Sequence, residues 1–416
     1  MRLTALVCLL APALATPQSP PLFVPRLDDP AILYESGETQ DLASDLQKRL
    51  DSGQAHLEFG DKWGYLESVL RELHIPVSSQ TLVFSKTSLQ VDRISPEHPR
   101  AIYFGDDVYV GLVRGGLLEV AAIDPQKGAM FYVMAQKKTA HPELIRKNEE
   151  CLKCHFSVNT MSVPGFLTRS VFTNSAGEPI LEAGSFLTDH RSPLNQRWGG
   201  WYVTGTHGDE RHLGNGTAKG SSYKIDTERG ANVIDLKGRV DTAQYPEPTS
   251  DVVALMVLNH QVQMHNLITR LGYEARLNRP ELAATIESTV RYMLFADEPR
   301  LRYRVTGTAP FRAEFEERGP KDHLGRSLRE TDLRRRLFRY PCSFLIYSDS
   351  FEALPAAVKE PLYQRLWEVL SGKDQSPAYQ SLTAADRRAV LEILVDTKPS
   401  LPEYFRSGLG LAGQLP

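Results

Sequence analysis

Apolar residues along the chain repeat with two different periods. Between residues 79 and 135 they form short alternating runs, which are separated by glycine-containing turns at residues 105–107 and 114–116. This alternation predicts an antiparallel sheet of several strands. Before it, leucines four residues apart predict a helix over residues 42–50, and a second helix is predicted over residues 65–73.

After Pro248 the period becomes helical. A long helix is predicted over residues 251–271, with Ser250 as its N-cap. His260 lies at the centre of its main apolar stripe, and His265 lies on the opposite side. A narrow polar stripe consists of Asn259, Gln263, Asn266 and Arg270. We therefore expect this helix to be buried over most of its circumference.

Shorter elements are predicted on both sides of residue 300. Two hairpin strands are expected over residues 166–172 and 179–186, and residues 342–347 form an apolar, strand-like run. Further helices are expected over residues 280–294, 357–370 and 383–394. The last of these begins with a capping-box pattern formed by Thr383 and Asp386.

The central part of the chain contains the sequence Cys-Leu-Lys-Cys-His at residues 151–155. Cys-x-x-Cys-His is the attachment signature of haem c, because two thiols one helical turn apart add to the vinyl groups of one haem and the histidine ligates its iron. The pattern predicts one covalent haem c, bound through Cys151 and Cys154, with His155 as an iron ligand.

Other kinds of site also use two cysteines at this spacing. A structural zinc site needs a second ligand pair at a suitable distance, and none follows. A thioredoxin-like dithiol follows a buried strand, whereas the polar residues 146–150 precede this motif. A disulfide across two residues is strained and leaves His155 without a role.

The first residues of the chain have the pattern of a signal peptide. A short positive start precedes an apolar run from Leu3 to Leu14, and a small-x-small cleavage site ends at Ala15. This predicts a protein that is periplasmic or otherwise exported, with a cleaved signal peptide. Of the four cysteines, Cys8 lies in this segment and two belong to the motif, so Cys342 has no partner and the fold cannot depend on a disulfide.

These features together predict an α+β fold, with N-terminal helices and an antiparallel sheet, a central haem c segment with strands, and a helical C-terminal part. The expected division is a signal peptide (1–15), a linker (16–30), an α+β domain (31–138), a haem c-binding segment (139–247) and a mainly helical region (248–416). No later run reaches about eighteen apolar residues, so stable membrane insertion is not expected. The net charge of −3 gives no reason to expect nucleic acid as a partner.

The segment from Arg197 to Gly208 is dense in aromatic residues and glycines. Trp198 and Trp201 are candidates to wall a haem edge, with core tryptophans as the alternative. Arg197 is a candidate to bind a haem propionate, because a guanidinium pairs with a carboxylate through two hydrogen bonds. Arg169, Arg191 and Arg211 offer the same chemistry.

The motif at 151–155, the Pro164-Gly165 turn, and residues 184–190, 198–208, 211–215, 260–266 and 370–375 resemble uncharacterised bacterial proteins described only as containing a cytochrome c domain. The resemblance covers nearly the whole mature chain and implies haem binding and electron transfer. Ordinary small cytochromes c are compact helical domains, whereas strands are predicted around the motif here. The small-cytochrome fold is therefore not expected.

The second axial ligand of the iron remains open from the sequence. His260 is the first choice, because it projects from the rigid apolar stripe of the long helix; a hydrogen-bonded core histidine is the alternative. The other candidates are His190, His207, His212, His265, Met161 and Met264.

Three functions remain in competition. The first is a periplasmic monohaem c-type cytochrome that transfers electrons to a redox partner that the sequence does not identify. The second is a haem enzyme of the peroxidase type, and the third is a haem-based sensor or binding module. Neither a catalytic residue nor the oligomeric state is evident from the sequence. Six-coordinate low-spin iron favours the first function, and five-coordinate high-spin iron favours the other two.

Overall fold

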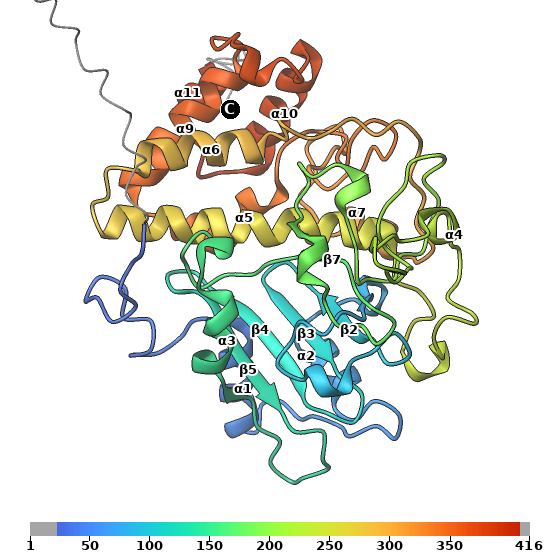
Figure 1. Cartoon of the computed structure of the whole chain (residues 1–416). Coiled ribbons are helices and arrows are strands. Elements are labelled where there is room, and N and C mark those ends of the chain that lie inside the picture. Colours follow the sequence, from blue (N-terminus) through green and yellow to red (C-terminus); the bar gives the residue numbers. More distant parts are fainter. Residues whose placement is uncertain (1–22, 408–416) are drawn as a thin grey trace, which may run out of the picture.

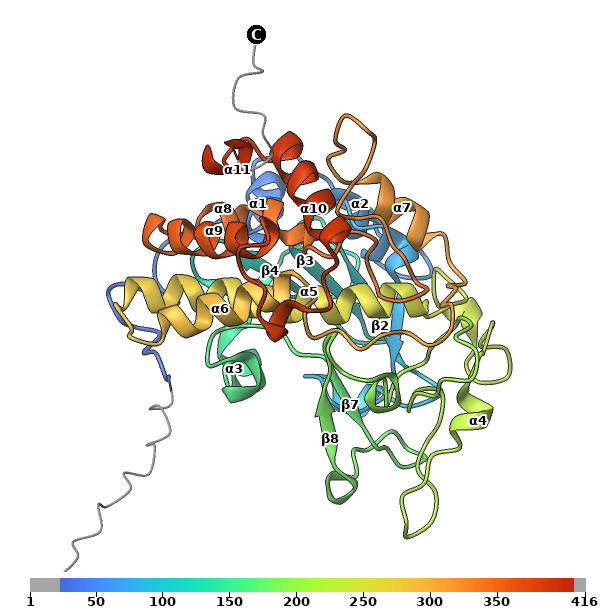
Figure 2. The ribbon, with the colours of Figure 1, turned by 90° about the horizontal axis from the view of Figure 1, so that it is seen from above.

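The computed structural model describes residues 23–407, so the predicted signal peptide, Cys8 and part of the predicted linker lie outside the described residues. Within this range, N-terminal helices cover one side of an antiparallel sheet, and a long helix crosses its other side (Figure 1). Further helices from the C-terminal part pack beyond the long helix (Figure 2). The predicted α+β class is confirmed.

The sheet consists of six strands in sequence order, each antiparallel to its neighbour. This confirms the sheet that the alternating apolar residues predict. The strands are β1 Thr81–Val83, β2 Arg100–Phe104, β3 Val108–Leu112, β4 Leu118–Asp124, β5 Gly128–Met134 and β6 Ile145–Arg146.

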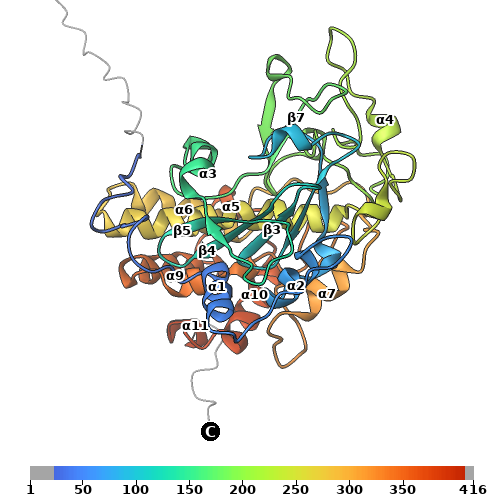
Figure 3. The ribbon, with the colours of Figure 1, turned by 90° about the horizontal axis from the view of Figure 1, so that it is seen from below.

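The two faces of the sheet belong to different hydrophobic cores, because alternate residues of a strand point to opposite faces. Val110, Val120 and Tyr132 share one core with α1 (Leu42–Asp51) and α2 (Leu66–Glu72). Tyr109, Ile123 and Phe131 share the other core with α5 (Val252–Arg276). Figure 3 shows α1 and α2 on one side of the sheet and α5 on the other.

The C-terminal part is helical, as the apolar period predicts. Helix α5 packs against α6, α6 packs against α9, and α9 packs against α10. No helix within residues 23–407 is long and apolar enough to cross a membrane. The remaining helices are α3 Asn148–His155, α4 Thr227–Gly230, α6 Leu282–Met293, α7 Phe311–Glu317, α8 Asp349–Glu352, α9 Ala356–Leu370, α10 Ala384–Thr397 and α11 Tyr404–Ser407.

Two local predictions are wrong. The N-cap of α5 is Asp251, whose carboxylate accepts hydrogen bonds from the N–H groups of Val253 and Ala254. The neighbouring Ser250 instead donates to the carbonyl of Tyr202. The apolar run at residues 342–347 is not a strand but leads into a 3₁₀ turn, Phe344–Tyr347.

Other local features agree with the sequence more closely. The predicted hairpin is present but short, with strands β7 Arg169–Val171 and β8 Ser185–Leu187. The capping box of α10 forms between Thr383 and Asp386. Cys342 is fully buried, and it forms no disulfide with the other cysteines of the described part, Cys151 and Cys154.

Replacing Asp251 with alanine should destabilise the protein strongly. Its buried carboxylate also accepts from the N–H groups of Thr308 and Ala309, so the substitution leaves four backbone donors without partners. We expect the free energy of unfolding to fall by about 2–3 kcal/mol in urea denaturation. Thr383→Ala, at the more exposed cap of α10, is the control and should cost about 1 kcal/mol. Equal losses in the two variants would contradict this account.

Candidate cofactor-attachment site

Helix α3 presents the three motif side chains on one side of its axis. Residues three and four apart lie on the same face of a helix, so Cys151, Cys154 and His155 are neighbours. The start of the helix is bound to β5 through both backbone groups of one residue, Phe131. The N–H of Phe131 donates to Asn148 Oδ1 at 3.0 Å, and the N–H of Lys147 donates to the carbonyl of Phe131 at 2.8 Å.

The imidazole of His155 is oriented by one hydrogen bond and one aromatic contact. Its Nδ1 lies 2.9 Å from the carbonyl oxygen of Gly165, and its ring centroid lies 4.8 Å from that of Phe131. A carbonyl only accepts, so Nδ1 carries the proton. Burial lowers the pKa of His155, which favours the neutral ring. The lone pair is then on Nε2, as an iron ligand requires.

The loop that supplies this carbonyl, residues 156–165, has a constrained backbone. Met161 and Ser162 both adopt left-handed conformations, with φ values of 60° and 57°. The loop is closed on the end of α3, because the N–H of Gly165 donates to the carbonyl of His155 at 2.9 Å. Its path thus returns to the histidine from which it starts.

The polar stripe of α5 holds this loop in place. Asn266 accepts from the N–H of Phe166 at 2.9 Å and donates to its carbonyl at 2.7 Å. Arg270 donates to the carbonyl of Met161 at 2.7 Å. A Cβ at Gly165 would come within 2.2 Å of Asn266 Oδ1, so only glycine fits there. Helix α5 therefore positions the carbonyl that orients His155.

The two motif thiols lie in different surroundings. Cys154 is exposed, whereas Cys151 is partly buried. Burial, followed by the negative charge of Glu119, raises the pKa of the Cys151 thiol to about 11. A redox-active dithiol instead needs a lowered thiol pKa. The raised pKa of the Cys151 thiol thus disfavours the thioredoxin-like alternative.

A metal site made of protein ligands alone is also absent at the motif. Within residues 23–407, the only three His, Cys, Asp or Glu side chains whose ligand atoms converge are Asp322, His323 and Asp396. His323 and Asp396 are both exposed. The motif residues form no such cluster, which leaves the zinc alternative without its ligands.

The aromatic and basic residues predicted to surround the haem lie in the protein core. Trp198 is 1% exposed and donates to Asn259 Oδ1, and Trp201 donates to the carbonyl of Arg169. The guanidinium of Arg197 is buried and donates to the carbonyls of His190 and Ser192. All three side chains use their polar groups inside the protein, so this arrangement favours the core alternative for the tryptophans.

The other predicted arginines differ in their partners. Arg191 pairs with Asp189 and Arg211 with Glu228. Arg169 donates to the hydroxyl of Ser185.

His260 is fully buried among aromatic residues of the core. Its Nδ1 lies 2.9 Å from Nδ1 of His190, and its Nε2 lies 2.8 Å from Ser343 Oγ. Its ring stacks on Tyr292, whose hydroxyl donates to the carbonyl of His260. Both ring nitrogens are therefore occupied, and this arrangement favours a core histidine over an iron ligand.

The remaining candidates for the second axial position divide by exposure. Only Met161 is partly exposed, and its sulfur accepts from Gln263 Nε2 at 3.2 Å. The other five are at most 1% exposed and are His190, His207, His212, His265 and Met264. The structure therefore brings none of the predicted histidines to the surface near α3.

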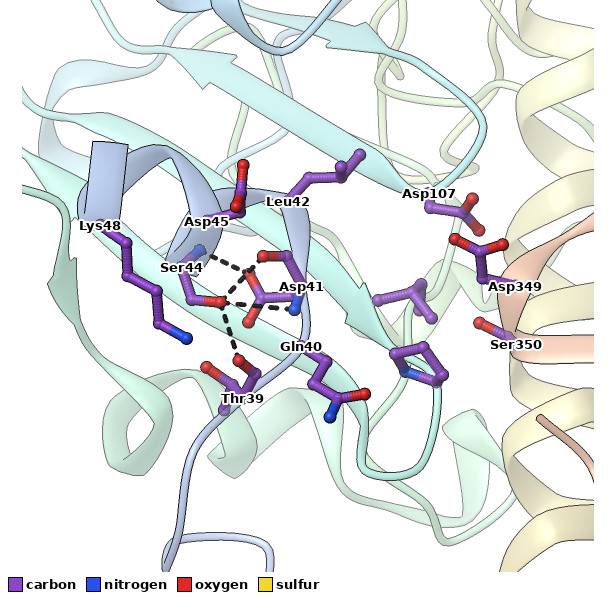
Figure 4. Close-up of a pocket in the computed structure, with 12 residues that line it drawn as sticks. Thr39, Gln40, Asp41, Leu42, Ser44, Asp45, Lys48, Asp107, Asp349 and Ser350 are labelled. Carbon is purple, nitrogen blue, oxygen red and sulfur yellow. Dashed lines mark hydrogen bonds between the residues drawn. The ribbon is translucent and has the colours of Figure 1, made fainter. Parts of the chain in front are cut away.

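A hollow of about 350 Å³ lies at a different place, between the start of α1, the end of β4 and α8 (Figure 4). Its walls carry the carboxylates of Asp41, Asp45, Asp107 and Asp349. Asp41 is already used, because it caps α1 and accepts from the hydroxyl of Tyr132. Burial, followed by the charge of Asp106, raises the pKa of Asp107 to about 7. The hollow contains no residue of the motif.

Several residues that build the site were not predicted from the sequence. Phe131, Gly165 and Asn266 lie on separate elements and carry no motif of their own. One signal was available in Pro164-Gly165, because a glycine often marks a close approach of two chain segments. Comparison with known proteins adds no further information: no family model matches the chain, and neither a curated protein nor a solved structure shows significant similarity to it.

The two motif thiols should react at different rates in the chain without haem. With a pKa of about 11, only about one Cys151 thiol in a thousand is ionised at pH 8, and the thiolate is the reactive form. We expect iodoacetamide to label exposed Cys154 at least about tenfold faster than partly buried Cys151. Peptide mass spectrometry after timed labelling measures both rates. Faster labelling of Cys151 would contradict the arrangement, and buried Cys342 should stay unlabelled until the chain unfolds.

Proposed function

We propose that the protein is a periplasmic monohaem c-type cytochrome that transfers electrons. The observation that carries this proposal is the geometry of α3. Cys151, Cys154 and His155 share one face, and the hydrogen bond from Nδ1 of His155 to Gly165 leaves Nε2 as the lone-pair nitrogen. Two thiols are the groups that attach a haem covalently, and this tautomer of the histidine is the one that ligates its iron.

Each residue of the site has a defined part in this proposal. The thiols of Cys151 and Cys154 form thioether bonds, and His155 ligates the iron. A haem c bound here supplies reversible one-electron chemistry. Phe131 and the Gly165 carbonyl hold the imidazole, and Asn266 holds the loop that carries this carbonyl. Exposed Cys154 places the attachment point where a redox partner protein can approach.

The location in the cell belongs to the same proposal. Residues 1–15 act as a cleaved signal peptide, which brings the chain to the compartment where haem is attached. The chain stays folded there without a disulfide, because Cys342 is buried and both other cysteines of the mature chain bind haem.

A haem protein with an open second axial position is the alternative function. The observation that favours it is the burial of six of the seven candidate ligands, which leaves partly exposed Met161 as the only accessible one. An open position suits a peroxidase-type enzyme or a ligand sensor. The absorption spectrum of the purified protein separates the two functions: low-spin six-coordinate iron supports electron transfer, and high-spin five-coordinate iron supports the alternative.

Substituting the motif cysteines should abolish covalent haem. We expect the exported wild-type chain to stain for haem after denaturing electrophoresis, and Cys151→Ala combined with Cys154→Ala to remove the stain. Cys342→Ala is the matched control and should keep it, because this thiol is fully buried and does not belong to the motif. His155→Ala should retain thioether-bound haem with an altered spectrum, since it removes only the iron ligand.

Two results would overturn the proposal. One is haem that acid-acetone extracts from the wild-type protein, and the other is undiminished staining of the double cysteine variant.

A further inference from the structure

One row of side chains crosses the face of the sheet on which α3 lies. The strand register places Ile102, Gly111, Glu119 and Val133 side by side on β2, β3, β4 and β5. Phe131 lies two residues before Val133, so both point to the same face. Because the ring of Phe131 contacts His155, this row faces the side of the sheet that carries the motif.

Gly111 is buried in this row, and it leaves a gap there because it lacks the side chain that its neighbours in the register carry. Its φ is not in the left-handed region, so its backbone accepts any residue. A Cβ built there would lie 3.4 Å from the nearest atoms of Glu119, which is an ordinary contact. A glycine inside a strand otherwise weakens the sheet and often marks a place where a ligand approaches closely.

The elements around this row leave apolar side chains exposed. Ile145, next to Val133 in the register, is 50% exposed, and Val158, just after α3, is 63% exposed. Leu181 and Leu187, in and beside the β7–β8 hairpin, are 69% and 46% exposed. Figures 1 and 2 show α3 and β7 on the same side of the sheet.

A partly buried ion pair lies beside Gly111. Arg100 Nη1 contacts Glu119 Oε2 at 2.7 Å, and Arg100 Cδ lies 3.6 Å from the Cβ position of Gly111. The Nε–H of Arg100 is buried and has no hydrogen-bond partner among the described residues. An unpaired donor of this kind is costly unless an acceptor binds it. A carboxylate is the acceptor that a guanidinium binds best.

Ala121 lies opposite Phe131 in the register and two residues after Glu119, so it points to the same face. We propose that the surface formed by Ile102, Gly111 and Ala121 is the face against which the haem of Cys151 and Cys154 lies, and that Arg100 binds one haem propionate. The inference rests on the proposed function, because the covalent attachment at α3 identifies the occupant. A flat apolar macrocycle covers the gap at Gly111 and the surrounding apolar side chains. Its carboxylate pairs with the guanidinium of Arg100, whose side chain is 19% exposed beside Gly111.

Filling the gap should expel the haem and leave the protein folded. Gly111→Val places a β-branched side chain, which strands favour, beside the side chains of Glu119 and Arg100. We expect the chain made without haem attachment to keep its circular dichroism and its melting temperature. The exported variant should lose most of its haem stain per chain, and Gly111→Ala, with one methyl group, should lose less.

Charge changes at the pair should move the reduction potential in opposite directions. Arg100→Gln removes a positive charge and should lower the potential, and Glu119→Gln should raise it, because the ferric haem carries one more positive charge than the ferrous haem. Arg49→Gln is the matched control. Its Nη1 contacts Glu72 Oε2 at 2.8 Å, in the α1–α2 layer on the other side of the sheet, so the potential should not change.

The outcomes separate this inference from the proposed function. Wild-type protein without covalent haem refutes the proposed function. The haem position alone is refuted if the wild-type protein carries haem, Gly111→Val keeps its full haem content, and the potential is unchanged in Arg100→Gln and Glu119→Gln. The potentials keep the inference testable even where Gly111→Val fails to fold.

Discussion

The buried polar side chains of α5 are the constraint on which the arrangement of the protein depends. A helix that is buried on nearly all sides has no water for its polar groups, so a polar group there is costly unless it has a partner inside the protein. Asn259 binds Trp198 and Thr168, and Asn266 binds Phe166. Gln261 binds the carbonyl of Gly105 in the turn between β2 and β3. One helix thus ties the sheet, the motif loop and the tryptophan segment together.

This constraint explains how a loop can orient a metal ligand. Residues 156–165 contain one short 3₁₀ turn, Val158–Thr160, which two consecutive left-handed residues follow, and they contain no strand. Asn266 and Arg270 bind it from a rigid helix, and its Gly165 carbonyl then fixes the His155 ring. The precision of the site comes from α5, although α5 supplies no ligand in this account.

The sequence predicts elements well where one local period dominates. The sheet followed from alternating residues such as Val108 and Val110, and α5 followed from its apolar stripe. The N-cap of α5 was not predicted correctly, because Ser250 and Asp251 are adjacent and both residue types cap helices well. The hydroxyl of Ser250 instead donates to the carbonyl of Tyr202, which lies far away in the sequence. The short apolar run at 342–347 was misassigned because six residues do not distinguish a strand from a tight helical turn.

The site was predictable only as far as its motif. The spacing of Cys151, Cys154 and His155 places them on one helical face, but nothing local reveals the bond to Gly165. The apolar stripe indicates that His260 is buried, yet its partners His190 and Ser343 lie 70 and 83 residues away in the chain. Gly111 stands between Val110 and Leu112, where the alternating pattern places no apolar residue, so the sequence alone did not single it out.

The mass of the denatured, exported chain tests the central claim most directly, because only a covalent bond survives unfolding in acid. The account predicts a single species with the mass of the mature polypeptide plus one haem. After digestion, this added mass should be confined to a fragment that contains both Cys151 and Cys154. A chain with the mass of the polypeptide alone, and with both of these thiols free to react, would contradict it.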